Sequence, residues 1–428
     1  MNASGTSEGF ANQKQQALLL VLFFAGSVVL QVLMFQFLPA PRERNRNGDY
    51  FGYYEPVALN LLAGKGLVED DGRAATRYPP GFPLLLTGIF SVADGMRIQR
   101  LQLVGVFNIL VSSFDCILVF FIAKFIFTVR VAAISALLWM TYPLQMWLSV
   151  QPNSEIPYLP MFLLSVLVAL HALGRRQPAL GLAAGCLLGF AALFRPAALI
   201  STVVMAGALL VLAPRAAKWR GLLASALLLF GFLLFVIPWE SYARSKASGE
   251  VALVAKGTSN VLDGLTFALP AAQHGEHTPL PEDVWKLMLR IDAQRPQLSS
   301  PGKVLSYMFD EFRENPVAVM KLILLKIVRA WFGTYNMHYD YEILIVQLVY
   351  LGAFGIGLWR ALRQYRDRLP YILFLILVVG SAWASCVLVM PIVRYLVPVM
   401  SLVLIIAAVG FDSALFSPRS APEVVAEA

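Results

Sequence analysis

The sequence predicts an all-α integral membrane protein with about ten transmembrane helices. Two observations support this fold class. Hydrophobic residues make up 58% of the 428 residues and charged residues only 14%, which is more apolar side chain than a water-soluble core can use. Apolar runs long enough to cross a hydrocarbon layer of about 30 Å also recur along the chain. We therefore expect a multi-pass helical bundle.

The predicted spans follow one another from residue 16 to residue 411. The first, residues 16–38, lacks a small-residue cleavage signal and is longer than the apolar region of a secretory signal peptide, so we interpret it as a retained anchor. The later apolar runs cover residues 102–127, 131–149, 157–173, 179–213, 221–239, 341–359, 371–390 and 393–411. We accordingly expect an N-terminal transmembrane module, an outer loop, C-terminal transmembrane helices and a cytoplasmic tail, at residues 1–240, 241–340, 341–411 and 412–428.

Basic residues at the ends of the spans predict the orientation, because lysine and arginine concentrate in cytoplasmic loops. Clusters lie at residues 175–176, 215–220 and 360–368. The run 179–213 separates the first two, so we expect it to cross twice and to reverse at Arg195–Pro196, where proline ends a helix and arginine resists burial. The same parity leaves both termini inside and these segments outside: 39–101, 150–156, 240–340 and Pro391–Arg394.

Two apolar segments are predicted to lie at the membrane surface without crossing. Residues 316–333 carry Lys321, Lys326 and Arg329 at helical spacing, which favours an amphipathic helix on the outer interface. Residues 81–93 are too short to span and are expected to form a re-entrant or interfacial helix. The outer loop should add short helices after Pro281 and from Ser300, which would make a small helical cap.

The chain lacks the motifs of several large enzyme classes. It has no Walker loop, no glycine-rich dinucleotide fingerprint, no His-Glu-x-x-His and no Gly-x-Ser-x-Gly, which argues against an ATP-driven pump or a hydrolase with a nucleophile elbow. His274 and His277 with Glu276 could ligate a metal ion, but two histidines in a polar loop more often bind nothing, so no metal site is predicted. The net charge of +8 is explained by topology, and no basic run interleaved with aromatic residues suggests nucleic acid.

Cysteine usage predicts no disulfide framework. The three cysteines, Cys116, Cys186 and Cys386, all fall inside predicted spans and are odd in number. We expect them to be packing residues.

Charged residues gather at the predicted outer ends of different spans. They are Asp49, Glu55, Glu155, Arg195, Lys256 and Arg394. Any one of them alone is most simply a solvated interfacial charge. Together they suggest a site for a lipid phosphate and a sugar, because a phosphate at that depth binds arginine or lysine while sugar hydroxyls bind carboxylates.

Five stretches in order carry a family resemblance. The first outer loop reads Asp49, Tyr53-Tyr54, Ala58, Gly64-Lys65-Gly66 and then Tyr78-Pro79-Pro80-Gly81-Phe82-Pro83. The other four are Asn153–Ile156, Ala184–Pro196, Pro238–Glu240 with Lys256–Asn260, and Pro391–Pro398. This pattern resembles the protein O-mannosyltransferase-like family, which is similar to the lipid A aminoarabinose transferases, over roughly residues 16–411.

The resemblance implies a GT-C glycosyltransferase of the bacterial cytoplasmic membrane, active at its outer face. Its donor would be a polyprenyl-phosphate-linked sugar, and it would transfer a hexose or pentose with inversion to a lipid, glycan or protein hydroxyl. The expected partners are this donor, membrane lipids and an unknown acceptor, without nucleic acid, and a requirement for a divalent cation stays open. The alternative is a lipid-linked sugar carrier without catalysis, but no repeated halves are visible and the acidic groups cluster at one face.

The resemblance and the predicted topology also assign roles to individual residues. We expect Asp49 to be the catalytic base, with Glu155 as its rival, because a hydroxyl that attacks an oxocarbenium-like centre loses its proton late and a carboxylate can then accept it. The alternative for Asp49 is a helix N-cap, and for Arg394 a helix anchor. The predicted phosphate-binding residues are Arg394, Arg195 and Lys256. The predicted substrate-positioning residues are Tyr53, Tyr54, Glu55, Tyr78 and Tyr395.

The loop departs from the family pattern at two places. The spacing from Asp49 to Ala58 is one residue longer than usual, so either Tyr53 or Tyr54 could fill the tyrosine position. Relatives often carry Arg-Asn after Pro-Trp, where this sequence reads Ser241-Tyr242-Ala243-Arg244, so Arg244 is either an offset equivalent of that arginine or unrelated to it. Both departures leave the identity of the substrate open.

Overall fold

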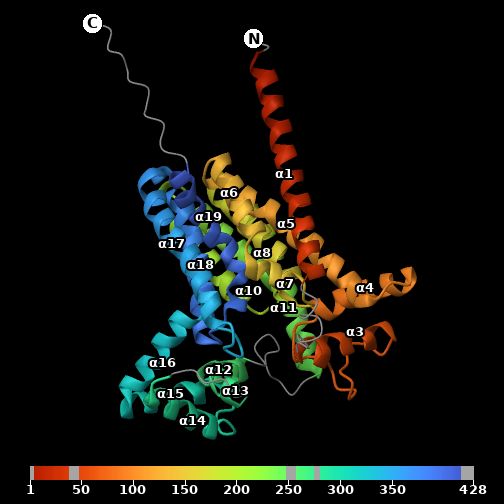
Figure 1. Cartoon of the computed structure of the whole chain (residues 1–428), viewed down its shortest axis with the longest axis vertical. Coiled ribbons are helices and arrows are strands. Elements are labelled where there is room, and N and C mark those ends of the chain that lie inside the picture. The colour runs from red at the N-terminus through yellow and green to blue at the C-terminus, as the bar shows by residue number, and fades with distance from the viewer. Residues whose placement is uncertain (1–3, 38–47, 247–256, 274–279, 416–428) are drawn as a thin grey trace.

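The computed structural model describes residues 4–37, 48–246, 257–273 and 280–415. These ranges are built from helices (Figure 1), and their only extended pairing is an isolated bridge between Val68 and Ala74. The predicted all-α class is confirmed.

Within the described ranges, six helices are long and apolar enough to cross a membrane. They are α1 (Ser4–Phe37), α5 (Arg100–Ile126), α8 (Glu155–Arg175), α11 (Lys218–Lys246), α17 (Asp340–Gln364) and α18 (Leu369–Leu388). A seventh span is made if α6 (Val129–Met140) and α7 (Pro143–Ser149), which meet at a 54° bend, count as one. The chain is therefore a multi-pass membrane protein.

Shorter apolar helices complete the bundle. These are α9 (Ala179–Ala192), α10 (Ala198–Leu212) and α19 (Val397–Leu415). Each is shorter than a full span in its apolar part, so the predicted total of about ten crossings stays a prediction.

The run 179–213 reverses where the sequence predicts it. Helices α9 and α11 lie side by side and run in the same direction, so close that a Cβ at Gly185 would collide with the backbone of Leu228. The start of α11, at Gly221, packs against Leu209 near the end of α10. Because α10 ends beside the start of α11, it runs opposite to α9, and the turn between them contains Arg195–Pro196.

The core lies where α5, α6, α8 and α19 pack together. The stretch 399–409 of α19 is buried throughout, which explains why this helix is apolar on all sides. At the periphery, only 11% of the apolar window of α1 and of α17 is buried within the protein. The apolar side chains that these two helices expose are therefore available to lipid.

Short helices gather at one end of the bundle, the lower end in Figure 1. A π-helical turn (Tyr50–Tyr54), α3 (Glu55–Leu62) and α4 (Gly81–Met96) follow α1 there. A second group consists of α12 (Gly257–Leu265), α13 (Leu269–Gln273), α14 (Glu282–Gln294), α15 (Pro301–Glu314) and α16 (Pro316–Arg329).

The second group forms the cap that the sequence predicts, with a hydrophobic core of its own. Helix α14 follows Pro281, and α15 begins at Pro301 with the Ser300 hydroxyl accepting a hydrogen bond from the Lys303 backbone N–H. Helix α16 belongs to this cap and lies outside the bundle (Figure 1). Its place in a membrane interface stays a prediction.

The structure corrects one expectation about α16. The amphipathic interpretation expects its cations on a solvated polar face, but Lys326 and Arg329 are buried, at 3% and 5% exposure. They lie against the end of α18, while Val317, Leu324 and Val328 are exposed. The backbone carbonyls that α18 leaves without helical partners attract these cations.

Candidate active site

Glu155, the first residue of α8, is the centre of the candidate site. Its carboxylate is 1% exposed and accepts hydrogen bonds from Arg394 Nε and, at 3.0 Å, from Arg394 Nη2. Arg195 Nη1 lies 2.8 Å from the same carboxylate. A buried carboxylate needs such partners because losing its water costs several kcal/mol. We call Glu155, Arg195 and Arg394 the Glu155 cluster.

Each member of the cluster lies at the start of a helix or in a short turn before one. Arg195 lies in the turn between α9 and α10, and Arg394 lies in a short 3-10 turn before α19. Glu155 is held at the start of α8 because the Asn153 side chain accepts a hydrogen bond from Ile156 N at 3.1 Å. Arg195 also donates to Ser154 Oγ at 3.2 Å.

The two arginines remain partly open. Their side chains are 17% exposed for Arg195 and 24% exposed for Arg394, although Glu155 between them is enclosed. The Arg195 guanidinium lies 5.2 Å from the centre of the Tyr395 ring, which supports it from one side. Part of each arginine side chain is therefore open to the surroundings beside the enclosed carboxylate.

Asp49 lies beside this cluster with Tyr78. The Tyr78 hydroxyl donates a hydrogen bond of 2.5 Å to Asp49 Oδ1. Asp49 has helical backbone angles and makes no side-chain capping hydrogen bond, which argues against the N-cap alternative. Burial, then the charge of Asp49, raises the pKa of the Tyr78 hydroxyl, so Tyr78 remains a donor at neutral pH.

Tyr54 connects Asp49 to the Glu155 cluster. Its ring centre lies 5.2 Å from that of Tyr78 and 5.1 Å from that of Phe82. Burial raises the pKa of the Tyr54 hydroxyl. The charge of Arg195 and a hydrogen bond with Ser154 act in the other direction and lower this pKa. The charge of Asp49 also raises the pKa of the Tyr54 hydroxyl, so Tyr54 interacts with both Asp49 and Arg195.

Two of the predicted positioning residues lie elsewhere. The Tyr53 hydroxyl accepts a hydrogen bond from Tyr78 N at 3.3 Å, and its ring lies 4.8 Å from the Arg77 guanidinium. Of the two tyrosines left open by the sequence, Tyr54 is therefore the one that faces the cluster. Burial raises the pKa of the Glu55 carboxyl, and the charge of Arg100 opposes this rise. Neither Arg195 nor Arg394 is among the groups that act on the Glu55 carboxyl.

Lys256 and the segment with His274, Glu276 and His277 lie outside the described residues. Across the ranges that the structure covers, no group of three or more His, Cys, Asp or Glu side chains gathers in a way that could hold a metal ion. The described cysteines are free, with Cys116 and Cys386 buried as packing residues.

The sequence interpretation missed Asp115, which is fully buried inside α5. Neither of its carboxylate oxygens has a hydrogen-bond partner in the described part of the protein. The signal was visible, because an acidic residue inside an apolar run of 26 residues, 102–127, is unusual in a membrane span.

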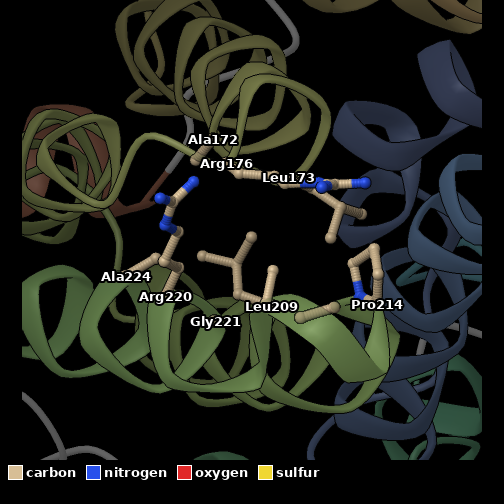
Figure 2. A pocket seen from close by; sticks show the side chains of 10 residues that line it. Ala172, Leu173, Arg176, Leu209, Pro214, Arg220, Gly221 and Ala224 are labelled. Atoms are coloured by element: carbon tan, nitrogen blue, oxygen red, sulfur yellow. The ribbon is translucent and has the colours of Figure 1, made fainter.

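A hollow lies at the opposite end of α8 from Glu155. It is bordered by Leu173, Leu209, Arg176 and Arg220, where α8 and α10 end and α11 begins (Figure 2). The two arginines belong to the clusters that predict the cytoplasmic side. The hollow is therefore separate from the candidate active site.

The described residues form a helical multi-pass membrane protein with an arginine–carboxylate cluster at one end of its bundle. Residues 77–242 match the family model described as dolichyl-phosphate-mannose-protein mannosyltransferase, a range that contains Glu155 and Arg195. This match covers less than half of the chain and confirms the family resemblance found in the sequence for that range. A comparison with curated protein sequences found no match.

Solved structures of an archaeal oligosaccharyltransferase, AglB from Archaeoglobus fulgidus, share the fold. The complex with an inhibitory peptide and a dolichol-phosphate is 14% identical, with a TM-score of 0.54 over 93% of this chain and 52% of that one. The apo form is 13% identical, with a TM-score of 0.57 over 92% and 51%. The form tethered to an acceptor peptide is 13% identical, with a TM-score of 0.55 over 92% and 50%. This chain thus spans about half the length of these structures.

Proposed function

We propose that the protein transfers a sugar from a polyprenyl phosphate to an acceptor hydroxyl at the outer face of a bacterial cytoplasmic membrane. The observation that carries this proposal is the Glu155 cluster, in which two partly open arginines share one enclosed carboxylate beside Asp49. The dolichol-phosphate held by the archaeal structure of the same fold agrees with a lipid-phosphate donor.

The charges of the cluster suit a sugar phosphodiester. Two guanidinium groups and one carboxylate leave one net positive charge, and the donor carries one negative charge. When the sugar leaves, the polyprenyl phosphate gains a second negative charge, so the attraction to Arg394 and Arg195 grows in the transition state. Arginine suits this role because it stays charged and can hold two phosphate oxygens at once.

Glu155 is a poor candidate for the catalytic base. Both arginines engage its carboxylate, which favours the charged form and occupies the oxygens that would accept a proton. We assign it to holding Arg195 and Arg394 at the spacing that a phosphate needs.

Asp49 is the better base, because it is half-buried and Tyr78 orients its carboxylate. The acceptor oxygen attacks the anomeric carbon from the face opposite the phosphate, and the bond from that carbon to the phosphate oxygen breaks. The hydroxyl proton passes to Asp49, and polyprenyl phosphate leaves with the bonding electron pair. Attack from the opposite face inverts the anomeric carbon.

The outer location follows from the distribution of basic residues. Arg176 and Arg220 lie at the end of the bundle opposite Glu155, and lysine and arginine concentrate on the cytoplasmic side. With that end inside, the Glu155 cluster and the cap face outward. The acceptor is then a lipid, glycan or protein hydroxyl that reaches the outer surface.

A deletion strain tests the function. We expect mass spectrometry of its surface glycans and glycolipids to show a missing sugar, which the wild-type chain restores. Complementation with Asp49→Asn should fail at normal expression, whereas the matched loop variant Glu55→Gln should succeed. Full restoration by Asp49→Asn would overturn the base assignment and support a carrier without catalysis or Glu155 as the base. An unchanged glycan profile after deletion would refute the proposed transfer itself.

A further inference from the structure

Arg394 lies in the short connection between α18 and α19, and this connection is not a regular element along its whole length. Residues 389–392 leave the helix before a 3-10 turn (Val393–Tyr395) carries Arg394 toward Glu155. The direction of the Arg394 side chain therefore depends on whatever holds residues 389–393 in place.

Arg329, the last residue of α16, holds this connection from the side of the cap. Its Nη1 donates to the Pro391 carbonyl at 2.9 Å, and its Nη2 donates to the Thr334 carbonyl at 2.5 Å. Its guanidinium also lies 4.6 Å from the centre of the Phe267 ring, between α12 and α13 of the cap. Arg329 thus links the cap to Pro391, which lies in the connection three residues before Arg394.

Asp340, at the start of α17, fixes the orientation of Arg329. It accepts a hydrogen bond from Arg329 Nη2 at 3.1 Å, and its other oxygen accepts bonds of 2.7 Å from the Thr334 backbone N–H and from the Thr334 hydroxyl. We call Arg329, Thr334 and Asp340 the Arg329 cluster. Because each carboxylate oxygen has a partner, the guanidinium fork is held in one orientation.

Further contacts to the backbone attach the connection to α16 and to the segment that follows it. Val393 N donates to the Gly333 carbonyl at 2.8 Å, directly beside Arg394. A Cβ at Gly333 would lie 2.7 Å from the Pro391 carbonyl oxygen, so only glycine allows this approach. One turn earlier on α16, Lys326 Nζ donates to the Leu388 carbonyl at 3.3 Å. The Leu388 carbonyl at the end of α18 and the Pro391 carbonyl of the connection are therefore satisfied by α16.

We propose that Arg329, oriented by Asp340, is a positioning residue that sets the direction of Arg394 toward the donor phosphate. The inference rests on the proposed function, because it assigns Arg329 a role in the same phosphate site. It also makes the cap part of that site, since Phe267 and α16 contact the group that holds the connection. Arg329 does not reach the phosphate itself, because its side chain is only 6% exposed and both terminal nitrogens of its guanidinium are held by the Pro391 and Thr334 carbonyls and by Asp340.

The first test measures the connection without any ligand. Hydrogen exchange of the purified protein in detergent should be faster in a peptide covering residues 389–396 for Arg329→Gln than for the wild type. The control is Arg290→Gln, which removes a cap ion pair with Glu311 that does not touch the connection. Unchanged exchange in residues 389–396 for Arg329→Gln would overturn the proposal.

The second test asks whether Arg329 acts through Arg394. We expect Arg329→Gln to weaken binding of undecaprenyl phosphate about tenfold, the cost of roughly one charge-assisted hydrogen bond. Arg329→Gln should have little further effect in a protein that already carries Arg394→Gln, because residues that act as one unit are not additive. An effect that persists in full in that background reflects general destabilisation and contradicts the positioning role.

The two tests separate the inference from the proposed function. If the wild type does not bind undecaprenyl phosphate, the proposed donor site is wrong, and the exchange experiment still decides whether Arg329 sets the connection. If the wild type binds and Arg329→Gln binds equally well, the donor site stands and the positioning role is refuted.

Discussion

Two clusters of arginine and carboxylate at the same end of the protein differ in how completely they enclose their charges. In the Glu155 cluster, the side chains of Arg195 and Arg394 remain 17% and 24% exposed. In the Arg329 cluster, the side chain of Arg329 is only 6% exposed, and backbone carbonyls occupy its fork. The partly exposed Glu155 cluster can accept an anion, whereas the enclosed Arg329 cluster can only fix the position of the backbone segments that it contacts.

The largest difference between the clusters should appear when arginine is changed to lysine. We expect Arg394→Lys to lower kcat about a hundredfold, because the compact lysine ammonium cannot contact Glu155 and the leaving phosphate together as the guanidinium can. Arg329→Lys keeps the charge near the same carbonyls and should cost no more than about tenfold. Turnover assays with a polyprenyl-phosphate donor check both values, and normal turnover of Arg394→Lys would reduce Arg394 to a helix anchor.

Neutralising the carboxylate of each cluster should give variants that respond differently to undecaprenyl phosphate in thermal unfolding. Glu155→Gln leaves two arginines without their counter-charge and should destabilise the protein by about 3 kcal/mol. Undecaprenyl phosphate should restore much of the lost Tm, because its phosphate replaces the carboxylate between the arginines. Asp340→Asn should also lower Tm but gain no more from the lipid than the wild type does. Equal rescue of both variants would contradict the distinction between open and closed clusters.

Tyr78→Phe should have a smaller effect that is confined to activity. It removes the hydrogen bond to Asp49 while keeping the ring packed against Tyr54, so we expect about a tenfold loss of kcat with Tm nearly unchanged. Tyr53→Phe is the matched control, since its hydroxyl meets only the backbone of Tyr78 among the described hydrogen bonds. Equal losses from both variants would argue that the loop packing, and not the Asp49 contact, sets the rate.

The smallest predicted effect is a pH dependence at Lys326, next to the Arg329 cluster. Burial lowers the pKa of Lys326 to about 8, so between pH 8 and 10.5 the folded chain binds fewer protons than the unfolded chain. The contribution of Lys326 to the free energy of unfolding therefore rises with pH between pH 8 and 10.5. We expect Lys326→Met to have the higher Tm at pH 7 and to lose this advantage by pH 10, as measured by thermal unfolding. Lys321→Met, at an exposed position paired with Asp283, should show no such trend.

Parts of the candidate site could be found from local pattern. Asp49, Arg195 and Arg394 were predicted because each is a charge beside a break in an apolar run, and the structure brings Arg195 and Arg394 together. Glu155 was predicted as a rival base, and its placement between the two arginines was not visible. Nothing in the spacing of residues 239 apart indicates that they will form an ion pair.

Other assignments depended on which way a side chain turns. Neighbouring residues such as Tyr53, Tyr54 and Glu55 share one pattern in the sequence, yet only Tyr54 faces the Glu155 cluster, because successive helical residues point in different directions. The burial of Arg329 was missed for a related reason, since an amphipathic pattern does not show whether its polar face meets water or the end of another helix.

The sequence alone determined the membrane class, the positions of the apolar runs, the reversal at Arg195–Pro196 and the family resemblance. Hydropathy, proline and motif spacing determine these features because each acts over a few neighbouring residues. Only the tertiary structure decided that Glu155 is shared by two arginines and that Arg329 holds the connection to Arg394. Those contacts join segments far apart in the chain, and their partners are selected by how the helices pack.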